Sequence, residues 1–131
     1  MASFVGTVAV LAHLVIALLH GMAHTELGIE LSAWQKNYVG IVIVAAPLLA
    51  GVLLWTRLAR LGFLLLAASL AGALIFGGFY HYLFVSVDHV SHLPPGEAQG
   101  LFRLTALLLV VTEVFGIVAG LFGLRSMRAK T

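Results

Sequence analysis

The chain has 131 residues, of which 62% are hydrophobic and only 9% are charged, and this composition excludes an ordinary soluble domain and predicts an integral membrane protein. The absence of cysteine excludes disulfides, zinc–thiolate sites, iron–sulfur clusters and cysteine nucleophiles. The formal net charge of +2, with no basic patch, argues against nucleic acid as a partner.

Four apolar runs are long enough to cross a hydrocarbon core of about 30 Å, which needs roughly 20 helical residues. We predict helices over about residues 4–24, 38–56, 60–84 or longer, and 97–125. The fold class expected is all-α: an antiparallel, up-down-up-down four-helix bundle in the lipid bilayer, forming a single transmembrane domain over residues 1–131. The first run lacks the Lys or Arg of a signal-peptide n-region, so we expect it to be retained.

The first run carries three histidines, His13, His20 and His24, spaced by seven and four residues. At about 100° per residue these positions fall on one stripe of a helix. Because an imidazole is costly in hydrocarbon without a partner, the stripe should face protein, water, a metal or a cofactor.

The second run contains Pro47 and no ionisable group between Lys36 and Arg57. We therefore expect it to face lipid or to form a structural wall of the bundle. A very short connection, residues 56–60, predicts a tight hairpin with the third run. The longer connection before the second run fits a short interfacial helix, with Trp34 at headgroup level.

The third run repeats the spacing of the first, with His81, Asp88 and His92 separated by seven and four residues. They share a stripe only if the helix continues past Phe84. A helix that long would project beyond the bilayer, so the alternative is that residues 85–93 form a loop folded over the mouth of the bundle. The sequence leaves this choice open.

The fourth run places Glu113 near the bilayer midplane, where an unpaired carboxylate is costly. His13 lies at matching depth, and the two are predicted to form a buried pair or proton relay. Further along, Gly116 and Gly120 form a GxxxG motif typical of close helix packing, either within the bundle or against a second copy or a larger membrane complex.

The cationic residues predict the orientation. Only Lys36 and Arg103 lie at the end that carries the histidines, whereas the opposite end has the others: Arg57, Arg60, Arg125, Arg128 and Lys130. The positive-inside rule then places both termini in the cytoplasm and the histidines toward the outer face, in a bacterial inner membrane if the host is bacterial.

Four functions fit these patterns. A transition metal (zinc, iron or copper) would use His20, His24 and His81, with Asp88 and His92 as further ligand candidates. Haem b for electron transfer would sit between His20 and His81. Proton or small-solute transport would use the polar residues that run from the outer end of the bundle to His13 and Glu113 near the midplane, and a non-catalytic accessory subunit is the fourth possibility. The sequence does not decide whether the protein catalyses a reaction.

Overall fold

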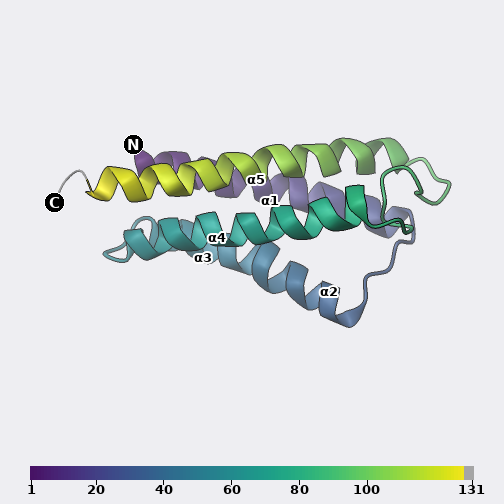
Figure 1. Ribbon diagram of the computed structural model, residues 1–131, viewed down its shortest axis with the longest axis horizontal. Helices are drawn as coiled ribbons and strands as arrows, with labels where there is room; N and C mark the ends of the chain where they lie inside the picture. The colour runs from purple at the N-terminus through teal and green to yellow at the C-terminus, as the bar shows by residue number, and fades with distance from the viewer. Residues whose placement is uncertain (129–131) are drawn as a thin grey trace.

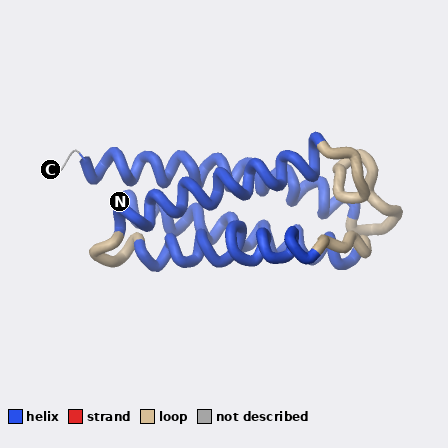
Figure 2. Tube along the Cα trace, turned by 60° about the horizontal axis from the view of Figure 1, so that its bottom comes forward, coloured by secondary structure: helices blue, strands red, loops and turns tan. Residues whose placement is uncertain are grey.

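The structure is a computed structural model that describes residues 1–128, and over this range the chain is helical with no strand (Figures 1 and 2). Four helical segments are long and apolar enough to cross a membrane, which confirms the prediction of four such helices. Both ends of the described chain lie at the same end of the molecule in Figure 1. Lys130, which contributed to the predicted orientation, lies outside the described residues. The elements are α1 (Ala2–Glu26), α2 (Ala33–Tyr38), η1 (Val39–Ala45), α3 (Ala46–Leu53), α4 (Ala59–Gly78), η2 (Phe79–Leu83) and α5 (Gln99–Arg128).

The link between the first two segments is set by local chemistry. Gly28 adopts a φ of 64°, a backbone conformation that favours glycine, directly after α1 ends. Ser32 then caps α2 in a capping box, because its hydroxyl accepts from the Gln35 backbone N–H while the Gln35 side chain accepts from the Ser32 N–H. The short helix expected in this connection therefore begins at Ala33, and it runs directly into the second span.

The second span is α2, η1 and α3 in continuous succession, and its middle part is a π-helix. Pro47 lies just after η1, and it has no N–H to donate to the carbonyl four residues earlier, that of Ile43. That carbonyl instead accepts a hydrogen bond from His13 Nε2 on α1, at 3.0 Å. The proline therefore frees a backbone acceptor in the span, and a histidine of α1 uses it.

The fourth span, α5, packs against both α1 and α4. Its glycine face is internal: Gly116 and Gly120 are buried, and a Cβ added at Gly120 would lie 2.8 Å from the Phe63 carbonyl oxygen of α4. A Cβ at Gly116 would overlap Leu70, also of α4. Of the two alternatives for this face, packing within the bundle is the one that the structure shows, since α4 occupies it.

The outer surface of each span is apolar. Large hydrophobic side chains are exposed on all four, including Val15 on α1, Ile41 on η1, Leu64 on α4 and Val118 on α5. Such a surface is unfavourable in water and fits contact with lipid.

Candidate metal centre

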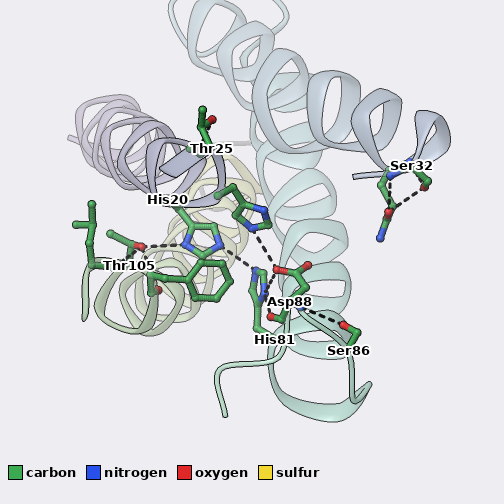
Figure 3. Close-up of polar contacts among 12 residues, drawn as sticks. His20, Thr25, Ser32, His81, Ser86, Asp88 and Thr105 are labelled. Carbon is green, nitrogen blue, oxygen red and sulfur yellow. Dashed lines mark hydrogen bonds and ion pairs between the residues drawn. The ribbon is translucent and has the colours of Figure 1, made fainter. Parts of the chain in front are cut away.

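Three histidines converge at the end of the bundle opposite the chain termini. His20 and His24 lie one turn apart on α1. His81 extends from η2 toward His20 (Figure 3). One ligand nitrogen from each lies within 4.8 Å of the others, and all three side chains are buried or partly buried. The two spans therefore bring together three of the histidines predicted as metal ligands.

A π-helical turn positions His81. The backbone N–H of Phe84 donates to the carbonyl of Phe79, five residues earlier, at 2.7 Å, and Phe84 then turns to an extended conformation that ends the helix. Single π turns of this kind widen a helix and are frequent at functional sites. Here the wide turn carries His81 into the bundle at the point where the span ends.

The segment after Phe84 is a loop folded back over the bundle end, which resolves the choice that the sequence left open. Two backbone contacts hold it: the Val90 N–H donates to the His81 carbonyl at 3.0 Å, and Arg103 Nε donates to the Val90 carbonyl at 2.9 Å. This fold buries Asp88, which is 5% exposed, beside the histidines. Asp88 therefore reaches the cluster through the loop and not through a continued helical stripe.

Hydrogen bonds fix which nitrogen of His20 carries the proton. His20 Nδ1 lies 2.9 Å from Thr105 Oγ1, and the Thr105 hydroxyl itself donates to the Leu101 carbonyl at 2.7 Å. Since the hydroxyl proton is directed to Leu101, the imidazole Nδ1–H must be the donor to Thr105. The lone pair of His20 then lies on Nε2.

Hydrogen bonds also fix the protonated nitrogen of His81. Its Nδ1 lies 3.1 Å from the Asp88 carbonyl oxygen and 3.2 Å from Asp88 Oδ1, and both of these atoms accept. The Nδ1–H of His81 must therefore donate, and its lone pair also lies on Nε2. The two Nε2 atoms face one another at 3.1 Å, so in the neutral pair two lone pairs point at each other. Such a contact repels unless a proton or a metal ion lies between the nitrogens.

The Asp88 carboxylate adds a second unsatisfied group. Its Oδ1 also lies 3.2 Å from His24 Nε2, yet neither carboxylate oxygen has an aligned hydrogen-bond donor, and His24 Nδ1 has no aligned partner. A buried carboxylate without a hydrogen bond is costly, and a nearby positive charge or a proton removes that cost. Facing lone pairs and an unsatisfied carboxylate are the environment in which a cation is stabilised.

The distances suit a small metal ion better than haem. Two imidazoles on a tetrahedral metal, with bonds of about 2.0–2.1 Å, have nitrogens roughly 3.4 Å apart, near the 3.1 Å between His20 and His81. Axial ligands on the two faces of a porphyrin would need about 4 Å, twice such a bond, with the macrocycle between them. Phe102 of α5 packs against His20, with the ring centroids 4.5 Å apart, and leaves still less room for a porphyrin beside His20.

The remaining predicted residues lie elsewhere. His92 is exposed, and its Nδ1 lies 3.3 Å from His89 Nδ1, so the structure does not bring it into the cluster. His13 and Glu113 are both buried, but His13 bonds to the Ile43 carbonyl. Among the described residues no hydrogen bond or ion pair joins His13 to Glu113.

Sequence reasoning missed Thr105, which sets the orientation of His20, and Phe102, which packs on its ring. Both lie on α5 and are buried. A threonine in an apolar run is expected to hydrogen-bond to the backbone of its own helix, and Thr105 does so. Nothing in the sequence indicated that it would also contact His20. Their role depends on how α5 packs against α1.

The fold and site together define a helical protein with four candidate membrane spans and a buried histidine cluster capable of holding a metal. Comparison of the chain with protein-family models, with curated proteins and with solved structures finds no match in any of the three. The functional conclusion therefore depends on the geometry alone.

Proposed function

We propose that this protein is a multi-pass membrane protein that binds a transition metal at His20, His24 and His81. The observation that carries the proposal is the convergence of three ligand nitrogens within 4.8 Å from two separate spans. The Nδ1–H groups of His20 and His81 donate to the Thr105 hydroxyl and to the Asp88 backbone carbonyl, the kind of orienting contact that metal-bound histidines require. Zinc and iron suit a nitrogen and carboxylate set without sulfur better than cuprous copper does.

Two roles in this site are compatible with the position of Asp88: orienting His81, or binding the metal as a fourth ligand. In the structure the backbone carbonyl of Asp88 accepts from the His81 Nδ1–H and Asp88 Oδ1 lies 3.2 Å from the same nitrogen, which supports a role in orienting His81 and placing a negative charge beside it. A small shift of the loop would let it serve as the fourth ligand beside His24. In either role its charge reduces the cost of burying a divalent cation.

The proposed setting is a bacterial inner membrane, crossed four times in up-down-up-down order with both termini in the cytoplasm. The support is the excess of arginine at the end where the described chain begins and ends. The metal site then opens toward the outer face. Haem b, with electron transfer, and a non-catalytic accessory role remain alternatives that no contact in the described residues favours.

Metal binding is tested directly with purified protein. Apo-protein is incubated with zinc, iron(II) or copper, freed of excess ion, and analysed for metal per chain. We expect about one zinc or iron per chain, lost in His20→Ala and in His81→Ala and retained in His92→Ala. His92 is the matched control because it is a histidine from the same end of the molecule that lies outside the cluster. Equal metal content in all four proteins would overturn the proposal, and a Soret band in the protein as isolated would select haem.

A second candidate, proton or small-solute transport, has one observation in its favour. A cavity of about 440 Å³ is lined by the three clustered histidines at one end and by Glu113 further inside the bundle. Proton flux into vesicles that is lost in Glu113→Gln would select this function.

A further inference from the structure

The cavity beside the histidines extends well beyond them. Besides His20, His24 and His81, it is lined by Glu113 of α5. Thr105, which contacts His20, lies eight residues before Glu113 on the same helix, a rise of about 12 Å. A volume of about 440 Å³ is within the range of pockets that enclose small organic ligands. The cavity is therefore larger than a metal site requires.

Apolar residues from all four spans line its walls, among them Ala73 and Phe76 of α4 and Leu109 of α5. Ala17 and Gly21 lie on α1, and Val39 and Ile43 lie on η1. Exposed Lys36 also lines the cavity, which marks the end that reaches the surface. Figure 1 shows α2 diverging from the other helices at this end. A ligand can therefore enter between α1 and the second span.

Glu113 is the polar group deep in this cavity. It is 2% exposed and lines the cavity, and among the described residues its carboxyl group makes no hydrogen bond or ion pair. A buried polar group without a partner costs free energy, so such groups are normally satisfied by protein, water or ligand. The protein offers Glu113 no partner, whereas the cavity leaves room for one.

We propose that this cavity binds a small amphipathic molecule, with an apolar body against α1 and η1 and a hydroxyl or carbonyl oxygen hydrogen-bonded to Glu113. The apolar walls favour the body, and the unpartnered carboxyl group favours the oxygen function. A hydroxyl suits Glu113 whether or not the carboxyl group carries a proton, because it can both donate and accept. The proposed contacts involve α1, η1 and Glu113 and none of the three histidines, so they do not depend on a bound metal, although the histidines line the same cavity.

Gly21 allows a sharp test. It lines the cavity, and a Cβ added there would have no heavy atom within 4 Å, so Gly21→Leu introduces a bulky side chain at the cavity wall without a clash at its Cβ. Gly40 is the matched control: its Cβ would also meet nothing within 4 Å, it is exposed, and it does not line this cavity. Gly28, with its positive φ, is unsuitable because a side chain there would strain the backbone.

The probe is 1-octanol carrying a photoreactive diazirine, applied to the full chain in phosphatidylcholine vesicles, with labelled residues mapped by mass spectrometry. We expect labelling at Ala17, Val39 and Ile43 that excess plain octanol displaces. Gly21→Leu should lower it at least fivefold and Gly40→Leu should leave it unchanged. Glu113→Leu should also lower it, with Glu113→Gln lowering it less because the amide still hydrogen-bonds. Helicity and elution volume confirm that each variant is folded.

Three results would overturn the proposal: labelling spread over lipid-facing residues, labelling that octanol does not displace, or equal labelling in Gly21→Leu and Gly40→Leu. The last result means that the cavity holds only water or a lipid tail. The experiment is run with and without added zinc. A protein that binds no zinc but is labelled as expected contradicts the proposed function alone. A protein that binds zinc but is not labelled in the cavity contradicts this inference alone.

Discussion

Thr105→Val tests whether hydrogen bonding prepares His20 to bind a metal. The substitution keeps the shape of the side chain and removes the oxygen that accepts from His20 Nδ1–H at 2.9 Å. The buried N–H is then unsatisfied, which costs about 1–3 kcal/mol, and the ring is free to move its proton to Nε2, the nitrogen that faces His81. One kcal/mol is about fivefold in an equilibrium constant, so zinc affinity should fall by about 10–100-fold.

The assay is zinc competition with a chromophoric chelator, and Thr112→Val is the matched control. Thr112 lies on the same helix and its hydroxyl also donates to the helix backbone, to the Leu109 carbonyl at 3.1 Å. Its hydroxyl contacts no histidine, so Thr112→Val should change zinc affinity by less than about twofold. If the two valine variants lose the same affinity, the hydroxyl of Thr105 does not orient His20 and the reasoning fails.

Three further predictions concern different parts of the molecule. Zinc affinity should be lower at pH 5 than at pH 8, because protons compete with the metal for the imidazole nitrogens, and titrations at the two pH values that agree would contradict this. Gly120→Ala should destabilise the fold by about 1–3 kcal/mol, because the added Cβ would meet the backbone of α4. Gly100→Ala should not, because a Cβ added there would have no heavy atom within 4 Å, and thermal melts in detergent compare the two variants. His13→Leu should cost about 1 kcal/mol less in a Pro47→Ala background, where the backbone N–H restored at position 47 can satisfy the Ile43 carbonyl, and additive losses in the double variant would disprove that coupling.

The four spans could be predicted from the sequence because one property determines each of them, an apolar run long enough to cross a membrane. The histidine stripe was also readable, since helical spacing alone places His20 and His24 on one face. What spacing cannot show is the partner across that face. The glycine face of α5 illustrates this limit, since GxxxG predicts close approach of a helix but not which helix, and here the answer is α4.

Asp88 shows a different limit. The seven-and-four spacing suggested one helical stripe for His81, Asp88 and His92, but the helix ends before the second of these. Loop geometry then brings Asp88 into the cluster and keeps His92 in the exposed part of the loop. The loop is held by contacts such as that of Arg103 with the Val90 carbonyl, which join residues far apart in sequence and leave no periodic signal.

The site carries two costs that a cation would remove together: the facing lone pairs of His20 and His81, and the Asp88 carboxylate without an aligned donor. Because the unfolded chain does not hold these groups together, a metal that binds here must stabilise the folded state. At a free zinc concentration about 100 times the dissociation constant, the gain is about 2.7 kcal/mol, which raises the melting temperature by several degrees for a chain of this size. In Asp88→Asn the carboxylate cost is absent, so the metal-free variant should melt at or above the metal-free parent and gain less from zinc. An equal zinc-induced shift in Asp88→Asn and the parent would show that the carboxylate is not coupled to the metal. A shift that persists in His81→Ala would place the zinc elsewhere.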